Sequence, residues 1–182
     1  MHTMKKKTVN YVDNEKFYAA IVEYRKHCDL AEQKGLDRPQ IPDYIGECIL
    51  KISKNLALLP KFSSYSYKDE MISDAIENSV LYFHSFDPEK SNNPFAYFTQ
   101  VTYYAYLRRL NFEEKTRYMT YKSFIETIGI NDMSLLSDSE GNAVASPDLY
   151  DNIYEFMRKF EKKEDEKKKQ RKSKKEGLEK FI

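Results

Sequence analysis

The chain is poor in the residues that build disulfide scaffolds, histidine-based metal sites and glycine-rich phosphate loops. Its 182 residues include two cysteines, three histidines, five glycines, six prolines and no tryptophan. Cys28 and Cys48 lack a CxxC spacing, so we expect them to be buried, reduced thiols. No HExxH, GxGxxG, Walker or GxSxG pattern occurs. The sequence therefore names no catalytic group, and we predict a protein that is not an enzyme and that needs no cofactor or metal.

Long apolar runs are also absent. No stretch of about 20 apolar residues occurs, so neither a transmembrane helix nor a membrane partner is expected. The basic start, Met1–Lys7, is not followed by the apolar segment of a signal peptide. The scarcity of glycine and proline favours helices, and 41% apolar residues suffice for a core. These features predict an all-α fold, with one compact helical domain and a flexible basic tail.

The formal net charge of +1 hides an uneven distribution along the chain. Residues 158–175 contain eleven Lys and Arg against four Asp and Glu, which is a local charge of +7. The remainder of the chain therefore carries a charge of −6. A basic stretch attracts phosphate, whereas an acidic body needs a specific site to contact DNA.

Helical spacing of apolar residues organises most of the chain. It predicts four helices, over 14–34, 43–59, about 68–86 and 93–117. Asn14 caps the first helix and Gly35 ends it, Pro60 ends the second, and Pro94 stands at the first position of the fourth. On the third helix, Ile72, Ile76, Val80 and Phe83 are expected to be buried. We expect a helical domain over 1–130, a flexible loop over 131–148 and a helix over 149–160. Residues 161–182 then form a basic tether, read either as a solvated helix or as disorder.

Two stretches are candidates for binding. Asp69, Glu70, Asp74 and Glu77 give the third helix an acidic side, which we interpret as solvated or partner-binding rather than metal-binding. Residues 95–124 contain ten aromatic residues, against about four expected from the composition. A stripe of Tyr97, Tyr104, Arg108 and Asn111 suits single-stranded nucleic acid, because bases stack on rings and cations neutralise phosphate. The alternative is that these tyrosines are core residues with their hydroxyls at the surface.

Residues 56–117 resemble conserved region 2 of the sigma-70 family. The resemblance rests on DEMISDAIENSVLYFHSFDPEK (Asp69–Lys90) followed by NPFAYFTQVTYYAYLRRL (Asn93–Leu110). The order and spacing of NYVDNEKFYAAIVEY, KDEMISDAIE, NPFAYFTQ and DLYDNIYEFM are similar to the late-transcription sigma factors of T4-type phages. This resemblance implies a sigma region 2-like domain that binds core RNA polymerase and opens an AT-rich, −10-like late promoter element in the cytoplasm of an infected bacterium.

The resemblance also assigns residues by position. The surface for the clamp coiled coil of the largest polymerase subunit would comprise Glu70, Ser73, Asp74, Glu77, Asn78 and Leu81. Promoter DNA would be contacted by Phe95, Tyr97, Phe98, Val101, Thr102, Tyr104, Ala105, Arg108 and Arg109. Most sigma-70 factors carry two tryptophans where this chain has Val101 and Thr102, so Tyr103 and Tyr104 are the candidate replacements.

The end of the chain resembles the short sliding-clamp-binding end of the same phage factors. Its apolar residues are Leu178, Phe181 and Ile182. The implied partners are the phage sliding clamp and a separate late co-activator. Two alternatives stay open: the terminus has no role, and the whole chain is a helical protein–protein adapter that never contacts DNA.

Overall fold

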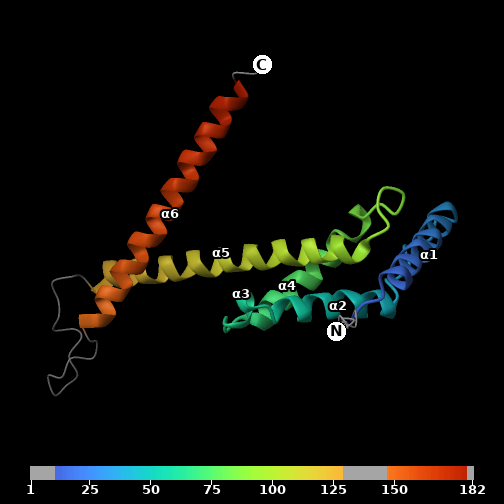
Figure 1. Ribbon diagram of the computed structural model, residues 1–182, viewed down its shortest axis with the longest axis horizontal. Helices are drawn as coiled ribbons and strands as arrows, with labels where there is room; N and C mark the ends of the chain where they lie inside the picture. Colours follow the sequence, from blue (N-terminus) through green and yellow to red (C-terminus); the bar gives the residue numbers. More distant parts are fainter. Residues whose placement is uncertain (1–10, 129–146, 180–182) are drawn as a thin grey trace, which may run out of the picture. The chain divides into compact units, whose positions relative to one another are not determined.

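The part of the chain that the structure describes is all-helical, as the composition predicts. The computed structural model describes residues 11–128 and 147–179, and no strand occurs among them. The helices are α1 (Asn14–Gln33), α2 (Asp43–Ala57), α3 (Pro60–Ser63), α4 (Lys68–Leu81), the 3-10 helix η1 (Phe83–Ser85), α5 (Pro94–Ile128) and α6 (Pro147–Glu179) (Figure 1). The chain divides into two compact units whose boundary falls inside α5, between Leu110 and Asn111. The sequence had instead predicted a single domain over 1–130.

Local signals fix the two ends of α1. Asp13, rather than the expected Asn14, caps the helix: its Oδ1 accepts hydrogen bonds from the backbone N–H groups of Glu15 and Lys16 at 3.1 and 3.2 Å. At the other end, Gly35 takes a φ of +65°, as a stop residue requires. The Leu36 N–H then bonds to the Ala31 carbonyl, which completes the capping motif.

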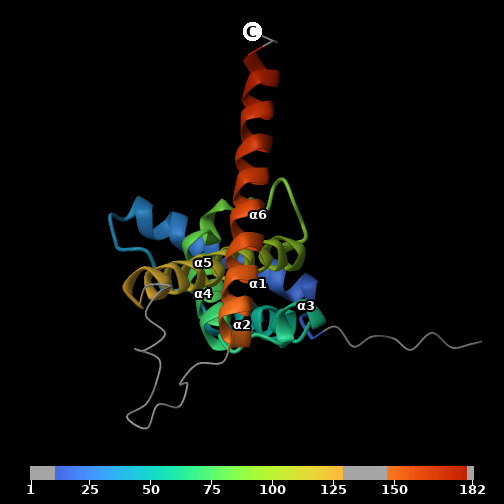
Figure 2. The same ribbon diagram turned by 90° about the vertical axis from the view of Figure 1, so that its left-hand side faces the viewer.

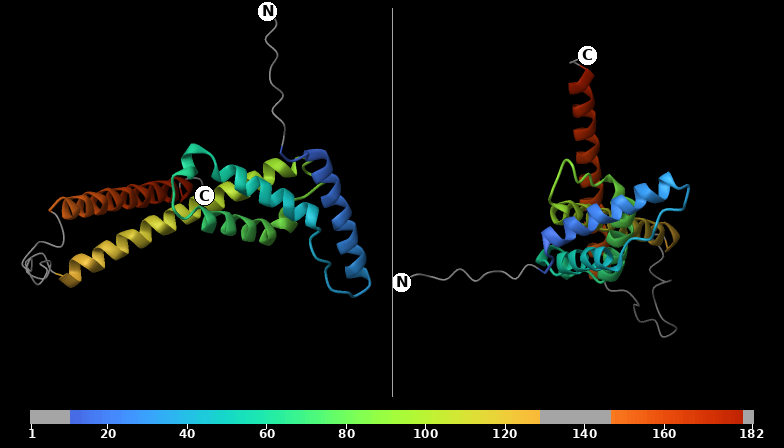
Figure 3. Two further views of the ribbon diagram at one scale, coloured as in Figure 1. Left: turned by 90° about the horizontal axis from the view of Figure 1, so that it is seen from below. Right: turned by 90° about the vertical axis from the view of Figure 1, so that its right-hand side faces the viewer.

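The first unit has two apolar clusters built on α2, which packs against both α1 and α4 (Figures 1 and 3). The larger cluster joins α1, α2, η1 and the start of α5, and Phe17, Ile49, Phe83 and Phe98 are among its members. The smaller cluster joins α2, α3, α4 and α5 around Phe62, Met71 and Tyr106. The Tyr106 hydroxyl donates a 2.7 Å hydrogen bond to the Ser53 carbonyl, so even the most buried tyrosine is satisfied.

A layer of small hydroxyl residues separates the two clusters. On each helix a fully buried hydroxyl residue stands between members of the two clusters: Ser53 on α2, Ser79 on α4 and Thr102 on α5. None of the three side-chain hydroxyls has a hydrogen-bond partner among the described residues. Small side chains at this level let the three helices approach closely, and the unpaired hydroxyls lower the stability.

The buried face of α4 differs from the predicted one. Met71, Ala75 and Ser79 are buried, Ile72 and Ile76 are half-buried, and Val80 is 49% exposed. Only Phe83 of the predicted stripe lies fully inside. The predicted stripe is therefore wrong by one residue, which is a rotation of about 100°. The buried positions are occupied by Met71 and by the small residues Ala75 and Ser79, while the isoleucines lie at the edge of the buried face.

Side chains of α1 and α5 hold the segment between α4 and α5. Arg25 of α1 donates hydrogen bonds to the carbonyls of His84 and Phe86. Tyr18 and Asn14, also of α1, donate to the carbonyls of Pro88 and Asn92. Tyr97 of α5 donates to the carbonyl of Tyr82. The Asn14 side chain also accepts a hydrogen bond from the Phe95 N–H. Five carbonyls of this segment are therefore satisfied by side chains of two other elements, which fixes the start of α5 relative to α1.

The second unit pairs the latter part of α5 with α6. Aromatic residues form the seam: Tyr118 stacks on Phe160 with centroids 4.5 Å apart, and Tyr121 meets Phe156 edge to face at 5.4 Å. The fourth helix was expected to end near Arg117, but this seam extends it to Ile128.

The C-terminal helix is also longer than expected. It was predicted over 149–160, yet α6 continues unbroken to Glu179 (Figure 2). For residues 161–179 the structure thus shows the solvated helix rather than disorder. Ion pairs Lys167–Glu164 and Lys168–Asp165, one turn apart, support it. The predicted loop over 131–148 lies almost wholly outside the described residues, as do Phe181 and Ile182, while Leu178 is described only as helical backbone.

Candidate functional site

The first part of α5 lies antiparallel to α4, and the contacts between them join the two predicted binding sets. Arg109 donates hydrogen bonds to Asp74, and Arg108 donates one to Asn78. Nearer the start of α5, the Tyr97 hydroxyl donates to the carbonyl of Tyr82, just after α4. The two helices therefore run in opposite directions. Asp74 and Asn78 belong to the predicted polymerase-binding set, and both arginines to the predicted DNA-binding set. The structure therefore brings members of the two sets together on one face.

The strongest of these contacts is the pair between Asp74 and Arg109. Arg109 donates from Nε and from a terminal nitrogen to the two carboxylate oxygens, each at 2.7 Å. The Asp74 side chain is 28% exposed and the Arg109 side chain is 22% exposed. Bidentate pairing is the strong form of a charged hydrogen bond. Asp74 was expected to lie on a solvated or partner-binding side of the helix. Its carboxylate is instead largely covered by Arg109, and a lysine at this position would face that guanidinium.

We predict that the Asp74–Arg109 pair contributes measurably to the stability of the first unit. In a double-mutant cycle with Asp74→Ala and Arg109→Ala, the coupling energy should be about 1–2 kcal/mol, reduced from a buried value by partial exposure. Chemical denaturation of the four proteins measures it. The exposed Lys51–Glu47 pair, at 3.2 Å on α2, is the matched control and should couple by less than about 0.5 kcal/mol. Equal coupling in the two cycles would contradict the prediction.

The other predicted polymerase-binding residues form an exposed stripe on α4. Glu70, Asp74, Glu77 and Leu81 recur at helical spacing, and Ser73 lies beside them. Glu70, Ser73 and Glu77 are exposed, and Leu81 is 69% exposed. The stripe combines carboxylates with an exposed apolar residue at its end. This composition suits a protein partner with a basic, partly apolar surface.

The predicted DNA-binding residues separate into two groups. Phe98, Thr102 and Ala105 are at most 1% exposed and belong to the interior of the first unit. Tyr104 is 51% exposed, Arg108 is exposed, and the remainder are half-buried: Phe95, Tyr97, Val101 and Arg109. Among the nine, only Tyr104 presents a largely accessible ring. Both readings of the aromatic stretch thus hold in part, since most of its rings are core and one is available for stacking.

Tyr97 is held rather than free. Its ring packs on Phe86 and Phe98 at centroid distances of 5.3 and 5.1 Å, and its hydroxyl donates to the Tyr82 carbonyl. Burial raises the pKa of Tyr97, so the hydroxyl stays a neutral donor at physiological pH. Its role in the described fold is to fix the start of α5 against the end of α4.

Sequence reasoning missed a cation beside the exposed tyrosine. The Lys61 ammonium lies 4.7 Å from the centroid of the Tyr103 ring and donates to the Tyr103 hydroxyl. Tyr103 in turn contacts Tyr104 edge to face at 6.1 Å. Lys61 follows Pro60, which was interpreted only as the end of a helix. Because Pro60 instead begins α3, Lys61 is carried back towards α5, a tertiary effect with no local signal.

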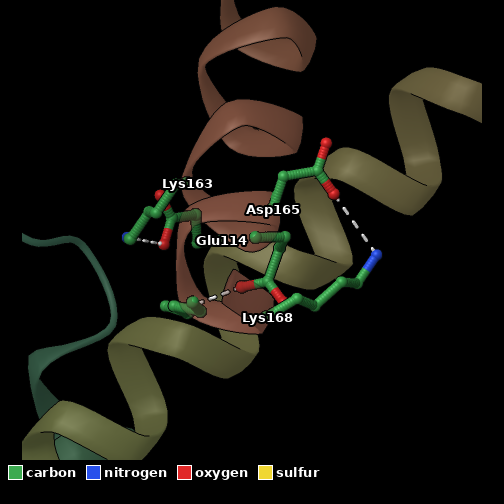
Figure 4. Close-up of polar contacts among 6 residues, drawn as sticks. Glu114, Lys163, Asp165 and Lys168 are labelled. Carbon is green, nitrogen blue, oxygen red and sulfur yellow. Dashed lines mark hydrogen bonds and ion pairs between the residues drawn. The ribbon is translucent and has the colours of Figure 1, made fainter. Parts of the chain in front are cut away.

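In the second unit, aromatic and charged side chains from the latter part of the aromatic-rich stretch, residues 95–124, contact α6. The Tyr118 hydroxyl donates to Glu161 at 2.7 Å, and this hydrogen bond raises the pKa of Tyr118. Lys163 pairs with Glu114 of α5, whereas Asp165 pairs with Lys168 within α6 (Figure 4). Tyr118, Tyr121 and Phe124 thus belong to a helix–helix seam and not to a nucleic-acid surface.

Other kinds of site find no support in the residues that the structure describes. They contain no group of three or more His, Cys, Asp and Glu side chains placed to hold a metal ion. Within 11–128 and 147–179, no helix combines the length and apolar character needed to cross a bilayer. No protein-family model matches the sequence, and the search of curated proteins found no match.

Proposed function

We propose that the chain is a sigma-type transcription initiation factor that binds core RNA polymerase through α4 and opens an AT-rich promoter element with the help of α5. The observation that carries the proposal is the shared α4–α5 face. On it an acidic stripe with exposed Glu70 and Glu77 adjoins exposed Tyr104 and Arg108, and the Asp74–Arg109 pair joins the two.

The arrangement supports a division of labour between the two helices. Carboxylates on α4 repel DNA, so they suit a protein partner and not a phosphate backbone. The Tyr104 ring and the Arg108 guanidinium lie one turn apart on α5, which suits an unstacked base with its adjoining phosphate. Arg109 reaches DNA only if it leaves Asp74. Polymerase docking on α4 would compete for that carboxylate, which links the two binding events.

Run-off transcription tests the proposal directly. Core RNA polymerase with this protein should produce promoter-dependent transcripts from a supercoiled, AT-rich late-promoter template, and core polymerase alone should not. The competing function, a helical adapter without DNA contact, shares the exposed α4 stripe. An adapter would bind a protein partner yet leave promoter DNA unprotected and unopened in the presence of polymerase.

Removing the exposed ring should weaken opening more than docking. Tyr104→Ala should reduce the open promoter complex by the equivalent of one stacked base, about 1–3 kcal/mol, while polymerase binding stays within twofold. Permanganate reactivity of unpaired thymines measures the opening. Tyr154→Ala, which removes an exposed tyrosine of α6, is the matched control and should leave opening unchanged. Unchanged opening in Tyr104→Ala would make this tyrosine structural.

The apolar end supports a second part of the proposal, activation by a sliding clamp. Leu178, Phe181 and Ile182 follow a charged stretch, residues 161–176, that has no apolar residue. A short apolar peptide joined to the folded part by a long charged segment suits binding to a groove on a partner protein. Deleting residues 178–182 should abolish clamp-stimulated transcription and leave clamp-independent initiation intact. Transcription with and without the loaded clamp measures both. Equal loss of the two activities would place these residues in the fold instead, and no loss of either would make them dispensable.

A further inference from the structure

The second half of α6 has no apolar side on which to pack. Apolar seam positions repeat along this helix at Ile153, Met157 and Phe160. Continued at the same three-and-four spacing, they reach Glu164, Lys167, Arg171 and Lys174. Residues 161–174 include no apolar and no aromatic residue. Over residues 161–174, therefore, all sides of this helix suit water or a charged partner.

Positive charge on this part of α6 is dense and mostly unpaired. Residues 167–174 contain six cations and no anion within about 12 Å of helix axis. Lys167 and Lys168 have acidic partners. Lys169, Arg171, Lys172 and Lys174 are exposed, and none of them makes a direct ion pair among the described residues, although Glu164 acts on Arg171 at longer range. Four cations without a direct ion pair thus lie within two turns of one helix.

These cations also repel one another. Residues 167–174 contain five like-charged pairs at a spacing of three or four, for example Lys168 with Lys172. Each pair destabilises the helix by about 0.2–0.5 kcal/mol. A polyanion that neutralises them relieves this repulsion, so binding and helix stability are coupled. A dense row of phosphates supplies that neutralisation better than the scattered carboxylates of a protein surface, because duplex DNA carries one charge per ~1.7 Å.

We infer that residues 167–174 of α6 form a second nucleic-acid site, which binds the backbone of duplex DNA independently of sequence and of RNA polymerase. The absence of aromatic residues excludes base stacking, so a single strand gains nothing beyond its phosphates. The absence of apolar residues likewise excludes insertion into a lipid surface. Duplex DNA offers the higher charge density, and its major groove admits a helix.

The site goes beyond the proposed promoter function, and its test needs no polymerase. Fluorescence anisotropy of the full-length protein with a GC-rich 20-base-pair duplex should show binding that weakens steeply with salt. Four neutralised phosphates give a slope of about −3.6 in log affinity against log salt, which is about a 150-fold loss between 50 and 200 mM. Far-UV circular dichroism should show increased helicity when the duplex is added.

Matched variants separate this site from overall charge. Replacing Lys169, Arg171, Lys172 and Lys174 with Gln should weaken binding at 50 mM salt by about tenfold or more and flatten the slope. Replacing Lys16, Lys51, Lys54 and Lys90 with Gln removes the same charge from exposed positions of the first unit and should leave the slope unchanged. Equal losses in the two variants, no loss in the α6 variant, or tighter binding of a 20-base oligo(dT) than of the duplex would overturn the inference. None of these results bears on promoter opening by the polymerase complex.

Discussion

Reversing the charge of Glu70 and Glu77 together should abolish co-purification of the protein with core RNA polymerase and leave its fold intact. Both carboxylates are exposed on α4, and neither takes part in the ion pairs recorded for the described residues. Substitutions at such positions usually change the free energy of unfolding by less than about 0.5 kcal/mol. A docking face built on these carboxylates would instead meet two like charges in its basic partner, which costs several kcal/mol. Asp74 is left unchanged because its loss would release Arg109.

A second charge reversal provides the control. Asp29 and Glu32 lie exposed on α1, and changing both to Lys alters the net charge by the same amount. This variant should bind core polymerase like the unchanged protein. Thermal unfolding followed by circular dichroism establishes that both variants are folded. Normal pull-down by the folded Glu70→Lys/Glu77→Lys protein would exclude α4 as the docking surface.

The second large effect concerns Phe98, which the resemblance assigns to DNA and the structure places in the core. Its ring is fully buried and lies 5.5 Å from Phe17 and 5.7 Å from Phe83, measured between centroids. Phe98→Ala should therefore lower the free energy of unfolding by about 3–5 kcal/mol, through lost burial and the cavity that remains. Denaturant titration without any DNA measures this loss.

Thr102 gives the contrasting case one turn further along α5. It too is fully buried, but its hydroxyl lacks a hydrogen-bond partner among the described residues. Thr102→Val keeps the shape and removes the unpaired group, so its stability should equal or exceed that of the unchanged protein.

A Phe98→Ala protein of normal stability with defective promoter opening would show that Phe98 acts on DNA and not in the core.

Helical spacing and stop residues predicted most of the first unit. Phe17, Ile21 and Tyr24 are buried on α1, and Ile45, Ile49 and Ile52 on α2, as their spacing indicates. Gly35 and Pro94 also take the expected places, at the end of α1 and the start of α5. These features depend on local periodicity and backbone conformation, which a single sequence records directly.

Features that depend on the neighbour of a helix could not be predicted in the same way. On α4 the larger apolar residues, Ile72 and Ile76, suggested the buried stripe, but close packing on α2 selects Ala75 and Ser79. The Asp74–Arg109 pair joins residues 35 positions apart, and nothing local marks either as the other's partner. The candidate site was therefore predicted as two separate sets, and their union on one face is a result of tertiary packing.

The hydrogen bonds that hold the segment between α4 and α5 also bear on how the protein is made. Asn14, Tyr18 and Arg25 reach carbonyls that lie between 59 and 78 residues later in the chain. At a synthesis rate of about 5–20 residues per second, α1 leaves the ribosome roughly 3–16 seconds before its partners exist. During that interval Phe17, Ile21 and Tyr24 have only the α2 side of their core available, because Phe83, Phe86 and Phe98 have not yet been added. The first helix to be synthesised is thus among the last to complete its tertiary contacts. The larger cluster of the first unit is complete only when the start of α5 has been added and packs against α1.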